Sequence, residues 1–267
     1  MNEKSFDFNL NIKTEAETGE AVEISGFDTD FEIIKTNTSE TNKASLIIWN
    51  LDDSLYQALT EKDNPVCIYA GYGKEEPALV FRGFISKIMK KTGVKSSDFA
   101  VFLEISDGKD VYTKAFINKN YRDKVTTSAI IKDCTDAMGL GLGMISTNYQ
   151  GRTYNSYKAK GFAHCILQKI CAAAGLKFSI QNGLVHIVSE NDEPVEETAY
   201  LLNSENSNCP KRSGKNEMTI TTCFTAQIVP NGSVKCEFDG VSGFYKVKSV
   251  KISGSNYGRA IIAEVTI

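Results

Sequence analysis

The sequence predicts a mainly β fold in which two antiparallel β-barrels flank a small α+β module of two helices and a β-hairpin. Three observations predict it: apolar–polar alternation fills roughly the first 115 residues, two segments with helical spacing follow, and alternation then returns. The expected boundaries are 1–117 for the first barrel, 118–192 for the module and 193–267 for the second barrel, which segments of the first can complete.

The first region begins with a regular alternation. Phe6, Phe8, Leu10 and Ile12 alternate with polar residues, which is typical of a half-buried strand. The other elements expected here are strands at Ala21–Ile24, Phe31–Ile33, Ala44–Leu51 and Phe99–Ile105 and a short helix at Ser54–Leu59. Because a closed or nearly closed barrel leaves no exposed strand edge, this succession of short strands predicts a barrel.

The segment Pro65–Lys91 predicts the central hairpin of this barrel. Its strands, Val66–Ala70 and Leu79–Met89, are joined by a turn at Gly71-Tyr72-Gly73, and a bulge is expected near Gly83. Both strands are apolar on their two alternating faces, which is typical of strands covered on both sides. This pattern predicts a barrel wall that lies between its own core and another protein.

Helical spacing predicts two helices in the middle region. The first is capped by Thr126 or Thr127 and ends at Gly139; the second carries its apolar stripe over 162–173 and ends at Gly175.

A hairpin is expected after the second helix, because Asn182-Gly183 lies between two alternating segments and both turn residues of such a hairpin need a positive φ. The register that this turn imposes pairs Ile180 with Val185 and Phe178 with Ile187. Those four side chains are expected to pack on the helices.

The third region is expected to be β again. The predicted strands are Met218–Val229, Val234–Phe238, Phe244–Val250 and Ala260–Ile267, with turns at Pro230-Asn231-Gly232 and Gly254–Gly258. These strands predict the second barrel.

Composition excludes several classes of function. The 267 residues are 42% hydrophobic and carry a net charge of −3 with both signs interspersed, so the chain has a core and lacks the positive field of a nucleic-acid-binding protein. No apolar run spans a membrane, and the amino terminus has no signal-peptide pattern. The seven cysteines form no CxxC pair, which favours a reducing cytoplasm and buried structural thiols, with Cys67, Cys134 and Cys165 at apolar positions.

No catalytic motif, cofactor site or metal site is expected. His164 and Cys165 are neighbours on a helix and should diverge by about 100°, so they are not expected to act together. His186 is expected on the surface opposite Ser179. The run Gly139–Gly143 follows a helix, so it is interpreted as helix termination and a flexible loop and not as a phosphate-binding loop. A pair of carboxylates that meets only in space stays open.

An ordered series of motifs carries a resemblance: FEIIKTNTSETNKASLIIWNLDD, VCIYAGYG, VFRGFISKI, FLEISDGKDVYTKAFINKNY, AMGLGLGMI, AAAGLKFSIQNGLVHIV and GFYKVKSVKISGSNYG. Together these resemble the baseplate hub proteins of phage tails, a family that includes the late-control protein D group, tailocin hubs and the hub half of type VI secretion spikes. The resemblance covers most of the chain and is weakest at Ser189–Ile220.

The resemblance implies a structural, non-enzymatic homotrimer with two tail-tube-like barrels in each subunit. Three subunits would present six similar barrels to a hexameric tail tube, act as a symmetry adaptor to a threefold spike or central fibre, and line the conduit. The implied partners are the chain itself, the tail-tube protein, the spike or fibre protein and other baseplate proteins. The implied place is the tail tip of a virion, tailocin or other contractile injection system assembled in the bacterial cytoplasm. DNA would pass through the lumen without specific binding, and no stable membrane insertion or cofactor is implied.

The sequence differs from larger relatives of this family in three ways: it has no lysozyme-like insertion, no needle-forming repeat and no acidic residue in the turn at Gly254–Gly258.

Three alternative functions stay open: a tail-tube or distal-tail component, a peptidoglycan-cleaving tail hydrolase, and a carbohydrate- or receptor-binding β module. Gly71, Tyr72, Gly73 and Tyr257 are the candidate interface residues.

Overall fold

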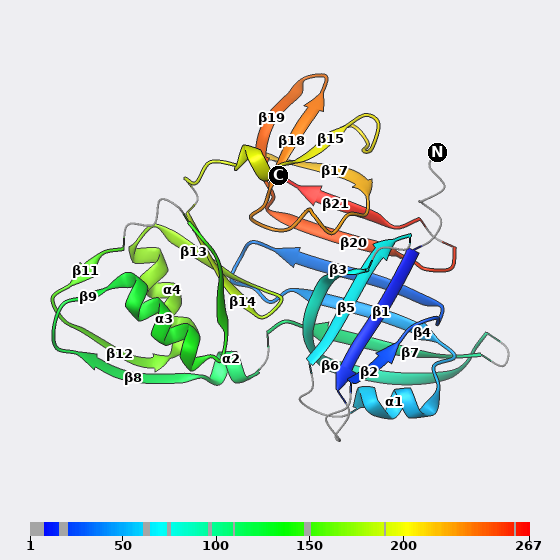
Figure 1. Cartoon of the computed structure of the whole chain (residues 1–267), viewed down its shortest axis with the longest axis horizontal. Helices are drawn as coiled ribbons and strands as arrows, with labels where there is room; N and C mark the ends of the chain where they lie inside the picture. The colour runs from blue at the N-terminus through cyan, green and yellow to red at the C-terminus, as the bar shows by residue number, and fades with distance from the viewer. Residues whose placement is uncertain are drawn as a thin grey trace. The chain divides into compact units, whose positions relative to one another are not determined.

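The computed structural model describes residues 8–15, 21–60, 65–73, 76–95, 98–108, 110–146, 151–189, 191–258 and 260–267. It confirms a mainly β protein with few helices (Figure 1). The chain divides into two compact units: residues 1–36, 42–106 and 194–267 form unit 1, and residues 37–41 and 107–193 form unit 2. No helix among the described residues is long and apolar enough to cross a membrane. The three-part division at residues 117 and 192 stays a prediction.

Unit 1 is built on one eleven-stranded sheet. In spatial order its strands are β16 (Lys211–Gly214), β17 (Glu217–Cys223), β21 (Ile262–Thr266), β20 (Ser249–Ser255), β3 (Thr29–Thr36), β4 (Lys43–Trp49), β7 (Asp98–Ser106), β6 (Ala78–Lys95), β5 (Pro65–Tyr72), β1 (Phe8–Glu15) and β2 (Ala21–Ile24). The neighbouring strands run antiparallel throughout.

The described strands do not confirm the two predicted β-barrels, which were expected to be closed or nearly closed. The end strands β16 and β2 do not pair with each other, so within the described residues the sheet stays open. Strand β20 pairs with β3 along its whole length, from Ser249 opposite Thr36 to Ser255 opposite Asp30. The two β regions therefore share one ladder, a long-range pairing that alternation along the chain cannot reveal.

The remaining elements of unit 1 complete its core. They are helix α1 (Asp53–Thr60), the 3-10 turn η2 (Glu196–Thr198) and a second sheet of β15 (Tyr200–Asn203), β18 (Ser233–Phe238) and β19 (Val241–Lys246). One face of the large sheet, Leu59 of α1 and Leu202 and Cys236 of the second sheet contribute to a single buried apolar cluster. Alternate residues of each strand point into this cluster, as period-two patterning requires.

The strand expected from Phe6 begins at Phe8 in the described residues, and Phe6 itself lies outside them.

The bulge expected near Gly83 is replaced by two register shifts, one at Val80 between β5 and β6 and one at Ser86 between β6 and β7. Gly83 stays in register opposite Val66, and a Cβ there would lie 2.6 Å from the carbonyl oxygen of Ser106. The glycine therefore permits close strand approach and does not mark the bulge itself.

Unit 2 packs helices α2 (Asp110–Lys114), α3 (Thr127–Ala137) and α4 (Ala163–Ala173) with short strands. Those strands are β8 (Phe116–Tyr121) with β12 (Tyr157–Phe162), β9 (Val125–Thr126) with β11 (Thr153–Tyr154), and the sheet β10 (Gly141–Ile145), β14 (Leu184–Ser189) and β13 (Leu176–Gln181). The predicted hairpin is confirmed: Ile180 lies opposite Val185, Phe178 opposite Ile187, and Asn182 and Gly183 have φ values of 53° and 83°. Thr126 caps α3 as expected, its Oγ1 accepting from the amide of Ala129. The segment interpreted as a flexible loop instead contains strand β10, which pairs in parallel with β14.

Candidate functional site

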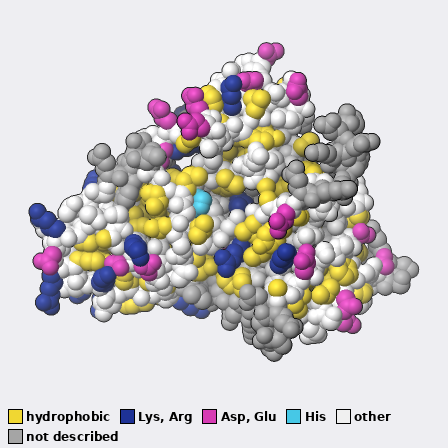
Figure 2. All heavy atoms as spheres, viewed as in Figure 1, with side chains coloured by type: hydrophobic (Ala, Val, Ile, Leu, Met, Phe, Trp, Pro, Cys, Tyr) yellow, Lys and Arg dark blue, Asp and Glu magenta, His cyan; other side chains and the backbone are white. Residues whose placement is uncertain are grey.

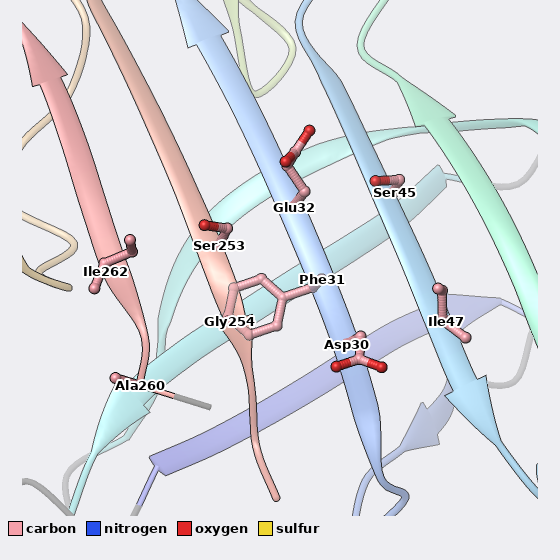
Figure 3. A pocket seen from close by; sticks show the side chains of 9 residues that line it. All are labelled: Asp30, Phe31, Glu32, Ser45, Ile47, Ser253, Gly254, Ala260 and Ile262. Atoms are coloured by element: carbon pink, nitrogen blue, oxygen red, sulfur yellow. The ribbon is translucent and has the colours of Figure 1, made fainter. Parts of the chain in front are cut away.

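The outward face of the large sheet in unit 1 carries two adjoining hollows. The first, of about 420 Å³, lies over β21, β20, β3 and β4 (Figure 3) and is lined by Asp30, Phe31, Glu32, Ser45, Ile47, Ser253, Gly254, Ala260 and Ile262. The second, of about 440 Å³, shares Glu32 and Ser45 with it and extends toward β7 and β6. Together they make a continuous shallow groove across the middle of the sheet.

Strand register places these side chains. Phe31 lies opposite Gly254 on the neighbouring strand, and a Cβ at residue 254 would come within 2.7 Å of Cγ1 of Ile261. Phe31 is itself buried, while its neighbours Asp30 and Glu32 point to the other face of the sheet. The glycine at residue 254 therefore leaves room for Ile261, which belongs to the buried cluster on the core side of the sheet.

Asp30 joins three parts of unit 1 at one end of the groove. Its Oδ2 accepts a hydrogen bond from the hydroxyl of Tyr257 at 2.7 Å and from Nε1 of Trp49 at 3.3 Å. The preceding Asn256 is tied to the start of β3, since its Oδ1 accepts from the amide of Thr29 at 2.8 Å. This places the predicted interface residue Tyr257, whose side chain is 45% exposed, at the rim of the sheet.

The other predicted interface residues lie at the end of β5. Tyr72 ends β5, and its ring contacts those of Phe8 at 5.3 Å and Phe224 at 6.1 Å between centroids, on the core side of the sheet. Burial raises the pKa of the Tyr72 phenol, and the nearby Cys223 thiol adds to the rise. Gly71 pairs with Asn9, whose Nδ2 donates to the carbonyl oxygen of Gly73 at 2.6 Å. Tyr72 therefore packs on the core side while Tyr257 bonds Asp30 at the rim, and the interface role of Gly71, Tyr72, Gly73 and Tyr257 stays a prediction.

Three lysines on the outward face are paired with glutamates across neighbouring strands, whereas Lys43, which lines the second hollow, makes no ion pair within the described residues. Lys13 meets Glu23 at 3.6 Å, Lys87 meets Glu104 at 3.3 Å and Lys251 meets Glu32 at 2.9 Å, each distance joining Nζ to a carboxylate oxygen. These exposed pairs add little stability. Their effect is local charge neutrality, since a cation and an anion stand side by side on β1–β2, β6–β7 and β20–β3.

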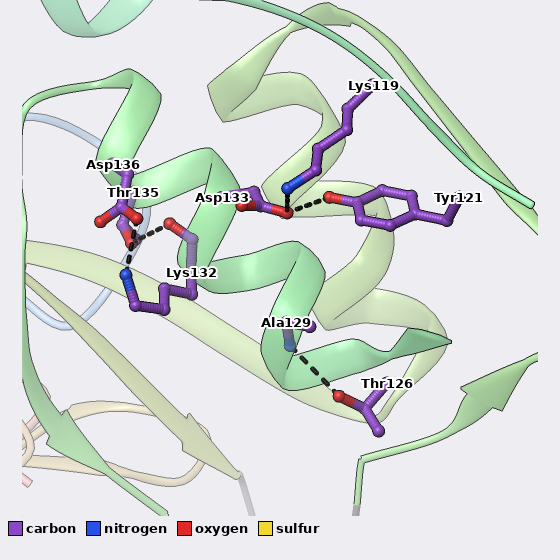
Figure 4. A network of polar contacts seen from close by, with 8 residues as sticks. All are labelled: Lys119, Tyr121, Thr126, Ala129, Lys132, Asp133, Thr135 and Asp136. Carbon is purple, nitrogen blue, oxygen red and sulfur yellow. Dashed lines mark hydrogen bonds and ion pairs between the residues drawn. The ribbon is translucent and has the colours of Figure 1, made fainter. Parts of the chain in front are cut away.

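Unit 2 contains a second polar network, shown in Figure 4. Oδ2 of Asp133 on α3 accepts from Nζ of Lys119 at 2.7 Å and from the hydroxyl of Tyr121, both on β8. Burial and the bond to Asp133 raise the pKa of Tyr121. Burial alone would raise the pKa of Asp133, but the bonds from Lys119 and Tyr121 outweigh it and leave that pKa below its ordinary value. The network clamps β8 to α3.

The thiols and imidazoles follow the sequence interpretation in part. Cys134 is buried as predicted, and burial raises its pKa to about 12, whereas Cys67 and Cys165 are partly exposed. The prediction that His164 and Cys165 diverge is wrong, because Nε2 and Sγ lie 3.2 Å apart. His186 lies opposite Ser179 as predicted, but the expected surface position is wrong, because His186 is half-buried beside β10 and Ser179 is fully buried. Within the described residues no group of three or more His, Cys, Asp and Glu side chains could hold a metal ion.

Comparison with known proteins gives a likeness of fold. No family model and no curated protein matches the sequence. The 43 kDa tail protein of prophage MuSo2 from Shewanella oneidensis superposes with a TM-score of 0.66 at 11% identity, over 96% of this chain and 98% of that one. A tail protein from Neisseria meningitidis gives a TM-score of 0.66 at 10% identity, over 96% and 95%. An Escherichia coli type VI secretion component, itself described as structurally similar to bacteriophage T4 tail proteins gp27 and gp5, gives 0.60 at 8% identity, over 90% and 73%. The chain therefore has the fold of phage tail proteins and of a type VI secretion component.

Proposed function

We propose that this chain is a structural tail or baseplate hub protein that, as a homotrimer, joins a hexameric tail tube to a threefold spike or central fibre and lines the conduit. The observation that carries the proposal is the extent of the likeness: two phage tail proteins share the fold over nearly the whole length of both chains. We also propose that the chain belongs to the late-control protein D group. Each subunit would then consist of two tube-like regions and an α+β module.

The outward face of the large sheet supports a conduit-lining role. Its carboxylates Glu23, Glu32 and Glu104 are paired with lysines, and the groove is lined mainly by serines and apolar side chains, with Asp30 and Lys43 among its charged residues. A surface with locally neutralised charge offers no run of cations to hold phosphates, so nucleic acid can slide past it. The proposed partners are the tail-tube protein, a spike or fibre protein and other baseplate proteins, in a virion, tailocin or related injection system assembled in the bacterial cytoplasm.

The test is the mass of the purified chain in solution, measured by size-exclusion chromatography with light scattering across micromolar concentrations. The monomer is 29.4 kDa, and a mass three times as large is expected. A hexamer would favour a tail-tube or distal-tail component, and a monomer at every concentration would contradict a self-sufficient trimer. A second test is zymography of the purified chain on bacterial cell walls. Clearing of the cell-wall substrate would contradict a non-enzymatic role and favour a tail hydrolase.

A further inference from the structure

The ribbon formed by β8 and β12 in unit 2 has two unlike faces. On the inner face Ile117 and Ala159 are buried in the core of unit 2, and Lys119 and Tyr121 are bonded to Asp133 of α3 (Figure 4). The ribbon is therefore held in place by packing and by charge-assisted hydrogen bonds. Its outward side chains are presented on a fixed backbone.

The outward face of this ribbon is exposed at every position. Its six side chains are Phe116, Asn118, Asn120, Lys158, Lys160 and Phe162. Phe116 is 56% exposed and Phe162 is 50% exposed, and their rings pack edge to face at 6.1 Å between centroids. Two adjacent aromatic rings that stay half open to water form a contiguous apolar patch, which is a candidate interaction surface.

The two outward lysines of the ribbon make this surface positively charged. Lys158 and Lys160 make no ion pair within the described residues, and the face that they share with the two phenylalanines carries no Asp or Glu. Being two residues apart on one strand, their side chains stand about 7 Å from each other. The complementary surface must supply at least two carboxylates next to an apolar side chain.

The acidic bridge, defined here as Glu193–Thr198, has this composition. Its side chains Glu193, Val195, Glu196 and Glu197 are exposed, Val195 to 52%, and none of the three carboxylates makes an ion pair within the part of the chain that the structure describes. The amide of Val195 donates to Oγ of Ser233 at 2.7 Å, and the amide of Ala199 to the carbonyl oxygen of Glu196 at 3.2 Å. These bonds order the bridge before any contact is made, which lowers the entropy that binding must overcome.

We propose that the outward face of the β8–β12 ribbon of one copy binds the acidic bridge of a second copy. Phe116 and Phe162 cover Val195, and Lys158 and Lys160 pair with the glutamates of the bridge. A second copy is the occupant because the two surfaces match in charge and in apolar content while neither has an ionic partner within the described residues of its own chain. The proposal rests on the trimer proposed above and names one of its contacts.

The contact joins two different surfaces, so it is heterologous and can repeat around a closed ring. Two patches of this size bury less than the roughly 1,000 Å² that a stable interface needs by itself. Their contribution is therefore to orient neighbouring copies and to strengthen other contacts between them, as paired charges at an interface do.

A charge swap tests the proposal in the full chain. Lys158→Glu/Lys160→Glu and Glu196→Lys/Glu197→Lys are each expected to raise the dissociation constant of the oligomer about tenfold or more, and the variant that carries all four changes is expected to recover association. Lys169→Glu/Lys215→Glu is the matched control, because it changes the net charge equally at exposed lysines outside the ribbon. Urea unfolding of each variant checks that surface changes leave the fold intact.

A peptide separates this proposal from the trimer itself. A labelled peptide with the sequence of residues 189–200 is titrated with the chain and with the Phe116→Ser/Phe162→Ser and lysine variants, at low and at high salt. If the wild-type chain is monomeric, salt-sensitive peptide binding that is lost in these variants supports the ribbon site although the trimer fails, and no binding overturns the site. If the wild-type chain is a trimer that none of the charge variants weakens, the site is overturned and the proposed function stands.

Discussion

Asp30 shows how one side chain can tie together parts of a sheet that lie far apart in sequence. Its Oδ2 receives bonds from Tyr257 and Trp49, while its Oδ1 is buried without a hydrogen-bond partner among the described residues. A carboxylate in this position depends on the donors that it has, because an unsatisfied charged group away from water is costly. Tyr257, expected from sequence to serve an interface, therefore also holds its own turn in place.

The first residue-scale prediction concerns this bond. Tyr257→Phe is expected to lower the free energy of unfolding by about 1 kcal/mol, because Asp30 keeps only the longer bond from Trp49. Urea denaturation measures the change. Tyr245→Phe is the matched control, since its hydroxyl reaches the carbonyl oxygen of Ser242 only at 3.5 Å, and an equal loss in both variants would contradict the role of Asp30.

The thiols supply a second residue-scale prediction. Burial raises the pKa of Cys134 and Cys171 to about 12 and that of Cys236 to about 11, whereas Cys209 and Cys223 are exposed. Because the thiolate is the reactive form, iodoacetamide at pH 8 is expected to label Cys209 and Cys223 first and to leave the three buried thiols intact until the chain unfolds. Peptide mass spectrometry after timed quenching gives the order, and early labelling of Cys134 would contradict the packing of unit 2.

The same shifts give a pH dependence with a definite sign. A thiol whose pKa is raised in the folded state stabilises the fold fully below its ordinary pKa of about 9 and loses that contribution as the pH rises toward 12. Unit 2, which contains Cys134 and Cys171, is therefore expected to lose stability above pH 9. Comparison of urea midpoints at pH 8 and pH 10.5 for the wild type and Cys134→Ala tests this, since the variant should show the smaller fall.

At the scale of elements, the hairpin of β13 and β14 shows how much of a structure two turn residues can determine. Asn182 and Gly183 both take a positive φ, which the Asn-Gly pair accepts with little strain and which fixes a two-residue turn. The turn sets the register, and the register puts Phe178, Val185 and Ile187 into the core of unit 2. Each step follows from neighbours in the chain, so the register and the core face of this hairpin could be predicted, whereas the burial of Ser179 on its other face could not.

The element-scale prediction follows from that turn. Gly183→Ala is expected to cost about 1 to 2 kcal/mol of stability, because an L-residue is strained at a φ of 83°. Gly258→Ala is the control, since the backbone there has no positive φ and a Cβ would meet no atom within 4 Å. Equal unfolding midpoints for the two variants in urea would contradict the turn geometry.

Strand β10 shows the opposite case, in which local pattern misleads. Its glycines were expected to end α3 and open a loop, and only Gly139, with a φ of 68°, has that role. Gly141 and Gly143 instead allow β10 to approach β14, because a Cβ at residue 143 would lie 2.5 Å from the ring of His186. A parallel partner some forty residues away leaves no signature in the run of glycines itself.

At the scale of the whole molecule, the single large sheet of unit 1 is the main difference between the predicted fold and the structure. Two barrels were expected from two β regions, and strands of both regions lie instead in one ladder joined by β20 and β3, while β15, β18 and β19 form a second sheet. On the outward face of that ladder several lysines pair with glutamates on the neighbouring strand, which is compatible with the proposed lining role.

The whole-molecule prediction is weak affinity for DNA. A labelled duplex of about 30 base pairs is expected to show no nanomolar binding at 150 mM salt, because affinity for phosphates depends on unpaired cations acting together. Fluorescence anisotropy measures it, and Lys13→Glu serves as a control because it should leave the result unchanged. Nanomolar affinity in the wild type would contradict the proposed lining role.

The sequence by itself determined the mainly β class, the capped helix after Thr126 and the register of the hairpin at Asn182-Gly183. Each depends on residues within a few positions of one another: alternation shows which face of a strand is buried, a threonine caps the helix beside it, and a turn fixes its own flanks. Only the tertiary structure decided that β20 pairs with β3, that β10 pairs with β14 and that Asp30 accepts a hydrogen bond from Tyr257. Alternation specifies the buried face of a strand but not its partner, and partners separated by some two hundred residues are selected by packing of the whole core.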